Sequence, residues 1–197
     1  MTPRAVIAIT GGIGAGKSVV SHILRTMRLP VYNSDSEART LMENDPGMHE
    51  QLRLHIHPQA VTEAGIDRAL ISSIVFADPG ALSRLNGIVH PRVAVHFAQW
   101  TARTHSPVAF IETAILHRCA PLHKLVSAEW HVTAPADIRI ARVMKRNGMT
   151  RDQVAARIRA QGPLPPVPGI PRTVLLNDGV TPLLPACLKA LETALKG

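Results

Sequence analysis

The sequence predicts an α/β fold in which a parallel five-stranded sheet is flanked by helices. Short apolar runs rich in β-branched residues alternate with segments whose apolar residues recur every three or four positions. This alternation is typical of buried parallel strands joined by helices. The 197 residues suffice for one domain, and hydrophobic residues make up 46%, enough for a packed core.

The predicted strands are short, and each is followed by a change to polar residues or glycine. They cover residues 5–10, 30–33, 107–112, 129–133 and 173–176. Helical spacing predicts helices over residues 17–28, most of 37–74, a long stretch from 78, then 136–147, 150–161 and a closing helix through 184–195. Within 37–74 we expect breaks at residues 45–47 and around Gly65. Pro91 lies inside the long helix, where we expect a kink or a restart. The proline-rich segment 162–171 has no room for a helix or a central strand.

Residues 11–18 read GGIGAGKS, which fits the P-loop pattern of glycine, four residues, then Gly-Lys-Ser. The glycines allow the backbone to approach phosphates closely, and successive N–H groups then form an anion-binding nest at the start of a helix. We expect Lys17 to reach the β- and γ-phosphates of ATP and Ser18 to offer its hydroxyl to Mg²⁺. The predicted nucleotide-binding residues are Gly12, Ile13, Gly14, Ala15, Gly16, Lys17, Ser18 and Val19.

The rest of the sequence excludes several classes of P-loop protein. The Asn-Lys-x-Asp guanine reader of GTPases is missing, and the chain is too short for the two motor domains of a helicase. A small kinase needs only a base for the acceptor hydroxyl and a cationic lid over the phosphates. The sequence therefore favours a small P-loop phosphotransferase.

Candidates for the base and the lid both exist. Asp35 follows the second predicted strand, where it could accept a proton from an attacking hydroxyl or simply cap a helix. Arg139, Arg142 and Arg146 are spaced by three and four residues, so they share one helix face. That face is either a solvated basic surface or a lid that clamps the transferring phosphate.

These motifs together resemble the dephospho-CoA kinase family over nearly the whole chain. The residues that carry the resemblance are the loop Thr10–Ser18, Asp35, Arg39, the LNGIVHP segment 85–91, Arg142, Arg146, the RIRAQ segment 157–161 and the NDG segment 177–179. The chain departs from the family pattern at Ala15, at Asn33 in place of an aspartate, at Val19 in place of a threonine, at Arg118 in place of a glutamate, and at Pro171-Arg172 before the last strand.

The resemblance implies that ATP phosphorylates the ribose 3′-hydroxyl of dephospho-CoA. It implies Asp35, Lys17 and Arg142 as catalytic residues. It implies substrate binding by Asp35, Arg39, His90, Arg92 and Arg146. The expected organisation is a single domain, 1–197, with a nucleotide-binding core (1–36, 106–134 and 172–197), a helical acceptor-binding insertion (37–105) and a helical lid (135–165).

The formal net charge of +8 fits polyanionic substrates. Two alternatives stay open: another small-molecule kinase of this architecture, and an ATP-driven switch that binds nucleic acid. The LNGIVHP segment disfavours the first, and the lack of an aromatic-rich basic strand disfavours the second. We expect a cytoplasmic monomer that binds neither nucleic acid nor membrane, with buried, reduced thiols at Cys119 and Cys187.

Overall fold

The computed structural model describes residues 3–196, which divide into two compact units. The first unit comprises residues 1–32 and 101–197, and the second comprises residues 33–100. No helix within residues 3–196 combines the length and the apolar character that crossing a membrane requires.

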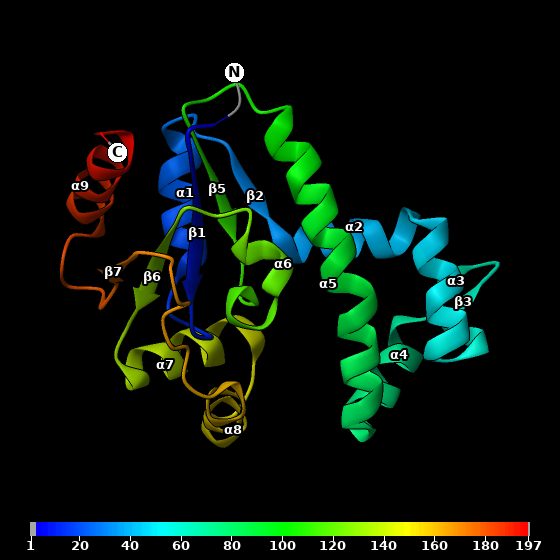
Figure 1. Cartoon of the computed structure of the whole chain (residues 1–197). Coiled ribbons are helices and arrows are strands. Elements are labelled where there is room, and N and C mark those ends of the chain that lie inside the picture. The colour runs from blue at the N-terminus through cyan, green and yellow to red at the C-terminus, as the bar shows by residue number, and fades with distance from the viewer. Residues whose placement is uncertain (1–2, 197) are drawn as a thin grey trace. The chain divides into compact units, whose positions relative to one another are not determined.

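The first unit is built on a five-stranded sheet with the strand order β2-β5-β1-β6-β7 (Figure 1). The ladders of β1 with β5, β1 with β6 and β6 with β7 are parallel. All five strands predicted from the sequence are confirmed, and one end of each is shifted by one residue. Their bounds are Ala5–Gly11 (β1), Val31–Asn33 (β2), Val108–Glu112 (β5), Ala128–Thr133 (β6) and Arg172–Leu176 (β7).

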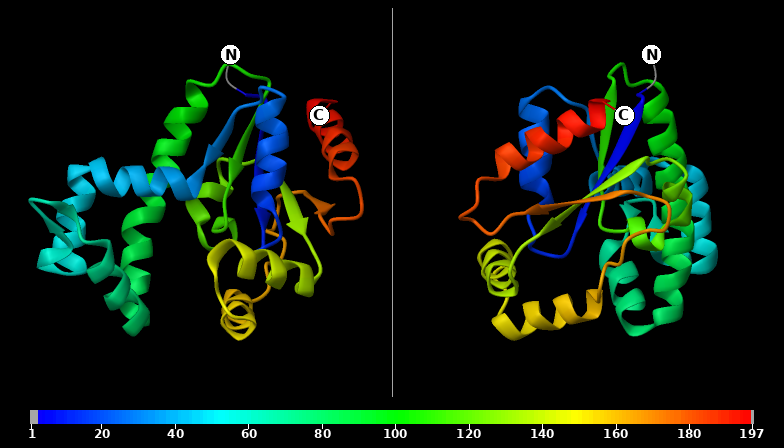
Figure 2. Two further views of the ribbon diagram at one scale, coloured as in Figure 1. Left: turned by 180° about the vertical axis from the view of Figure 1, so that it is seen from behind. Right: turned by 60° about the vertical axis from the view of Figure 1, so that its left-hand side comes forward.

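Helices α1 (Lys17–Thr26) and α9 (Leu183–Lys196) lie on one face of this sheet (Figure 2). Side chains that alternate along the strands meet the two helices in the main core, where Phe110 packs against Trp130 with ring centroids 5.1 Å apart. Cys187 is buried in this core, and Cys119 is buried elsewhere in the unit, both as free thiols. The alternate positions of β1 and β6 therefore face the other side of the sheet.

Two helices, α7 (Ala136–Asn147) and α8 (Arg151–Gln161), form the predicted lid segment. They share a small core of Ile140, Val143 and Val154. Thr150 begins α8 with a reciprocal capping box to Gln153. Residues 162–171 contain no helix or strand, as predicted, and η2 (Leu116–Arg118) and α6 (Ala120–His123) connect β5 to β6.

The second unit is helical around a core that includes Met48, Leu52 and Ile71. Its helices begin with side-chain caps, since Asn33, Asp45 and Asp67 each accept a hydrogen bond from a backbone N–H three residues later. The elements are α2 (Ser34–Asn44), α3 (Pro46–His55), η1 (Pro58–Ala60), β3 (Val61–Thr62), β4 (Gly65–Ile66), α4 (Arg68–Ala77) and α5 (Pro79–Ala102), the last ending just beyond the unit.

Two predictions for this unit are corrected by the structure. The break expected around Gly65 contains an antiparallel hairpin of β3 and β4, and these two strands were not predicted. Helix α5 also runs unbroken through Pro91, so of the two expected outcomes the restart is wrong, and the kink stays a prediction. Proline removes one N–H donor there, but Leu85, Ile88 and Val89 pack against the core on the preceding turns and hold the helix together.

Candidate active site at the phosphate-binding loop

The loop between β1 and α1 adopts a conformation that only glycine accommodates without strain. Gly14 has φ of 78° and Gly16 has φ of 95°, both in the left-handed region. A Cβ atom on Gly11 would collide with the carbonyl of Val132, and one on Gly14 would meet the backbone of Arg139. The glycines thus serve the turn and also let the loop pack closely against β6 and α7.

Helix α1 begins at Lys17, and Gly16 before it supplies no side-chain cap. Uncapped N–H groups and the helix dipole make such an N-terminus favourable for an anion. The Lys17 ammonium donates to the carbonyl oxygen of Gly11 at 3.0 Å, so it lies over the loop. Ser18 is exposed in the first turn, where its hydroxyl is accessible.

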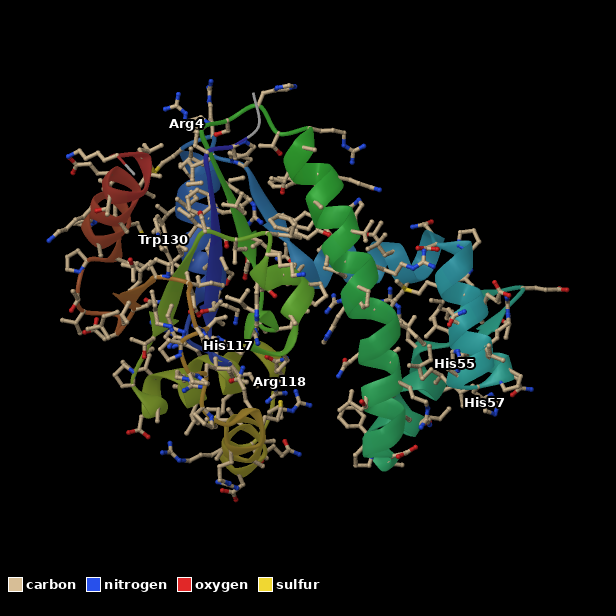
Figure 3. The ribbon with its side chains drawn as sticks, in the orientation of Figure 1. Arg4, His55, His57, His117, Arg118 and Trp130 are labelled. Carbon is tan, nitrogen blue, oxygen red and sulfur yellow. The ribbon has the colours of Figure 1, made fainter. Side chains whose placement is uncertain are left out.

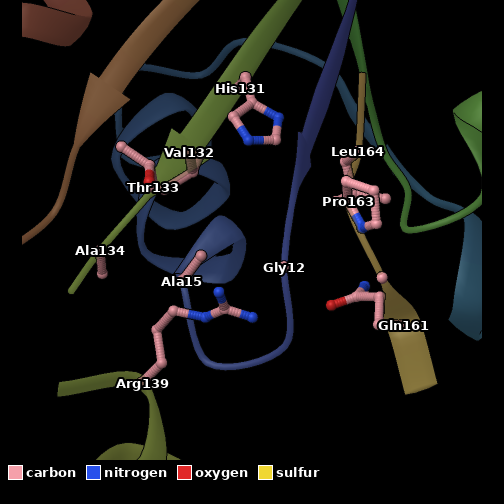
Figure 4. A pocket seen from close by; sticks show the side chains of 11 residues that line it. Gly12, Ala15, His131, Val132, Thr133, Ala134, Arg139, Gln161, Pro163 and Leu164 are labelled. Carbon is pink, nitrogen blue, oxygen red and sulfur yellow. The ribbon is translucent and has the colours of Figure 1, made fainter. Parts of the chain in front are cut away.

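The lid segment is bonded directly to this loop. Arg139 Nε donates to the Ile13 carbonyl at 2.8 Å, and the Ile13 N–H donates to Gln161 Oε1 at 2.9 Å. Figure 4 shows the two side chains directed at the loop from two sides. Burial lowers the pKa of Arg139 from its ordinary value, although the guanidinium stays charged at neutral pH.

Arg142 joins the loop to the segment after β7. It donates to the carbonyl of Asn177 at 3.0 Å and to Asn177 Oδ1 at 3.2 Å, and it lies 3.5 Å from the Ala15 carbonyl. Asn177 in turn donates to Ala15 at 3.0 Å. Arg146, on the same helix, is exposed and donates to Asn147. Arg139 and Arg142 therefore reach the loop, whereas Arg146 does not contact it.

A pocket of about 150 Å³ lies beside the loop (Figure 4). Its lining includes Gly12, His131, Thr133, Arg139 and Gln161. The polar groups converge where the loop, β6 and the end of α8 meet, all within the first unit.

The predicted acceptor-side residues lie in the second unit. Asn33 Oδ1 caps α2 by accepting from the Ser36 N–H at 2.9 Å, so Asp35 in the first turn is not the cap. Asp35 and Arg39, four residues apart on α2, are both exposed. Arg92 NH1 pairs with Asp45 at 2.9 Å. His90 is half-buried, and burial lowers its pKa, which favours the neutral imidazole.

Sequence reasoning missed a buried charged cluster on the sheet face opposite α1. Glu129 pairs with Arg172 through two hydrogen bonds, at 2.8 Å and 3.2 Å, and accepts another from the Thr10 hydroxyl. Burial opposes its ionisation, but bonds from His131, Arg172 and Thr10 prevail and lower the pKa of Glu129 to about 2. The available signal was the pair Glu129 and His131 alternating along a strand predicted to be buried.

Two departures from the family pattern acquire structural roles. Arg172 also donates to the carbonyls of Leu164 and Pro165, at 2.9 Å and 2.7 Å, and so holds the proline-rich connector. Arg118 donates to the backbone carbonyl of Gln161 at 2.9 Å, at the end of α8. Figure 3 marks Arg118 and its neighbour His117 near the carboxyl ends of the strands. Arg118 thus stabilises the end of α8, and Arg172 stabilises the connector that follows it.

The central strand leads into a glycine-rich loop and a helix, the sheet has the order β2-β5-β1-β6-β7, and arginine-bearing helices are bonded to the loop. This combination defines a P-loop kinase. A sequence model of dephospho-CoA kinase matches residues 5–182, and the chain belongs to the dephospho-CoA kinase family.

Individual relatives agree with this assignment. The dephospho-CoA kinase of Bacteroides fragilis is 34% identical over 186 residues, covering 94% of this chain and 90% of the relative. That of Thermus thermophilus is 35% identical over 192 residues, covering 98% and 92%. A crystal structure of a Thermus thermophilus protein superposes with a TM-score of 0.81 at 32% identity, covering all of both chains. The dephospho-CoA kinase of Campylobacter jejuni has the same fold, with a TM-score of 0.62 at 17% identity over 98% of each chain.

Proposed function

We propose that this chain transfers the γ-phosphoryl group of ATP to the ribose 3′-hydroxyl of dephospho-CoA, with Asp35 as the base. The observation that carries the proposal is the glycine loop bonded by Arg139, Arg142 and Gln161, in a chain that matches its family over residues 5–182. The proposed phosphate site rests on the loop, and the proposed acceptor rests on family membership. The small-molecule acceptor also fits the basic net charge.

ATP would bind with its phosphates against the residues Gly12 to Val19. The left-handed glycines and the uncapped start of α1 suit an anion at this position. The exposed hydroxyl of Ser18 would hold Mg²⁺, which neutralises part of the charge on the phosphates. Lys17 would exchange its bond to the Gly11 carbonyl for phosphate oxygens.

Arg142 would stabilise the charge that develops on the γ-phosphoryl oxygens. Its guanidinium is already held at the loop by Ala15 and Asn177, so little reorganisation is needed to meet an anion there. Arg146 is exposed on the same helix and is free to turn from Asn147 toward a substrate phosphate. The lid would also exclude water, which limits wasteful hydrolysis of ATP.

The second unit, residues 33–100, would bind dephospho-CoA. Because Asn33 performs the capping, the Asp35 carboxylate is available to orient the acceptor hydroxyl and accept its proton. Arg39 is exposed four residues later, where it would meet an acidic group of the acceptor. His90 would act as a neutral hydrogen-bond partner, and Arg92 would contribute from its pair with Asp45. We propose that the chain acts as a monomer.

The test is ADP release from Mg-ATP with and without dephospho-CoA, in wild type and in Asp35→Asn. Dephospho-CoA should stimulate the wild type strongly, and the variant should lose about 10²–10⁴-fold of kcat while still binding ATP. Asp152→Asn is the matched control, because Asp152 is also an exposed carboxylate in the first turn of a helix.

Each part of the proposal can fail separately. An Asp35→Asn enzyme with kcat close to wild type would remove Asp35 as the base. A folded wild type that binds ATP but is not stimulated by dephospho-CoA would contradict the acceptor assignment. Stimulation by DNA or RNA instead would favour the nucleic-acid switch.

A further inference from the structure

Three side chains with metal-ligating atoms meet on the sheet face opposite α1 and α9. Glu129 and His131 are two residues apart on β6, so they project from the same face, and His117 comes from η2. Each of the three residues offers one ligand atom within 4.8 Å of the other two. Glu129 Oε1 lies 3.3 Å from His117 Nε2 and 3.7 Å from His131 Nδ1.

The two separations from Glu129 Oε1 are close to those of a tetrahedral site. With metal–ligand bonds of about 2.0–2.2 Å, two ligand atoms of a tetrahedral zinc ion lie about 3.3–3.6 Å apart. Two imidazoles and one carboxylate also form a donor set that suits zinc and similar transition metals. A fourth position would be left for water.

An independent observation comes from His117. Its side chain is only 7% exposed. Within residues 3–196, neither of its ring nitrogens has a hydrogen-bond partner of normal geometry. Buried polar atoms are normally satisfied, because leaving them without a partner costs free energy. A metal ion bonded to Nε2 would satisfy one of these two atoms.

The surrounding residues would hold the ligands in place. In the strand register, Thr10 lies opposite His131 and Arg172 lies opposite Glu129. Arg172 donates to both carboxylate oxygens of Glu129, to Oε2 at 2.8 Å and to Oε1 at 3.2 Å, and Thr10 also donates to Oε1, so the carboxylate is fixed. Thr10 Oγ1 lies 3.1 Å from His131 Nδ1, a contact that a metal ion on Nδ1 would replace. Such outer partners orient metal ligands. The Arg172 charge opposes any cation, so a hard ion such as Mg²⁺ is disfavoured relative to one that bonds imidazole strongly.

We propose that His117, Glu129 and His131 bind one divalent transition-metal ion of the zinc class, at a site separate from the Mg²⁺ of the nucleotide. The ion links the segment after β5 to β6. It also lies next to the pocket that His131 shares with Gly12 and Arg139, as Figure 4 shows for those three residues. This site does not depend on the proposed acceptor or on Asp35.

The experiment is a titration of the metal-free, tag-free full chain with Zn²⁺ in competition with a chromophoric chelator. One ion per chain should bind, and His117→Gln and His131→Gln should each weaken binding by at least about tenfold. His22→Gln is the matched control, because His22 is an exposed histidine on α1, and it should bind like the wild type. The melting temperature of each protein is measured with and without metal, and Zn²⁺ should raise it in wild type and His22→Gln alone.

Absence of a bound ion in the wild type would overturn the proposal. So would equal affinity in the wild type and the two cluster variants. Should a cluster variant not fold, the absorption spectrum of wild type loaded with Co²⁺ decides. Intense visible bands of a four-coordinate ion support the site, and the weak spectrum of six-coordinate aqueous Co²⁺ contradicts it.

Discussion

The first unit contains a buried ion pair, whereas two ion pairs of the second unit lie on the surface. In the first unit, Glu129 is fully buried and pairs with the nearly buried Arg172. In the second unit, the pairs Arg68–Glu43 and Arg84–Asp78 lie on the surface, with about half of each side chain exposed. A buried charge must keep its partner, whereas an exposed charge is solvated by water when its partner is lost. The buried pair of the first unit should therefore be far more sensitive to a change of charge than these two exposed pairs.

The same contrast applies to the candidate site. The first unit presents backbone groups of a glycine loop, and its arginines are held by carbonyl oxygens. The second unit presents exposed side chains such as Asp35 and Arg39 on a helix. A ligand bound by backbone groups requires the rare conformations of the loop glycines. A ligand bound by exposed side chains requires only that those side chains match its own groups. Substitutions can test both sides of this comparison.

The largest expected effect on stability is that of Arg172→Met. It leaves Glu129 buried without its cation and also frees the connector carbonyls of Leu164 and Pro165. We expect a loss of about 3–5 kcal/mol in the free energy of unfolding, measured by urea denaturation. Arg68→Met, which breaks the exposed pair with Glu43, should cost at most about 1 kcal/mol. Equal losses in the two variants would refute the contrast between the units.

Substitution of one glycine in each unit should change the free energy of unfolding by a smaller amount, and in opposite directions. Gly16→Ala forces φ of 95° on a residue with a Cβ atom, which would also collide with the side chain of Asn177. It should destabilise the chain by about 1–3 kcal/mol. Gly87→Ala lies inside α5 with open space around the new methyl group, so it should stabilise the chain by about 0.5–1 kcal/mol. Urea denaturation of the ATP-free protein measures both changes in the free energy of unfolding. Destabilisation by Gly87→Ala would contradict the prediction that α5 accommodates the new methyl group.

The sequence was sufficient to predict the sheet and the loop because their signals are local. β-branched runs mark the buried strands, and the spacing of Gly11, Gly16 and Lys17 marks the phosphate site. The hairpin of β3 and β4 was missed because each strand has two residues, too few to show alternation. The restart expected at Pro91 did not occur, because the cost of this proline depends on the packing of the whole of α5.

The charged cluster could not be predicted for a different reason. Glu129 and His131 share a face through strand alternation, but their partners Thr10, His117 and Arg172 are supplied by β1, η2 and β7. Only the strand register brings these elements together. The same holds for Arg142, whose spacing predicted a shared helix face but not its bonds to Asn177. Long-range pairing therefore sets the limit of what the sequence alone predicts here.

A modest effect is also expected at the residue that caps α2. Asn33→Ala removes the oxygen that accepts from the Ser36 N–H, which should lower the free energy of unfolding by about 0.5–2 kcal/mol. Asn33→Asp keeps that oxygen and adds a negative charge at the helix N-terminus, so it should be at least as stable as the wild type. Urea denaturation of the three proteins measures the difference. If Asn33→Ala were as stable as Asn33→Asp, the cap would contribute nothing, and the argument that Asn33 leaves Asp35 available would lose its energetic basis.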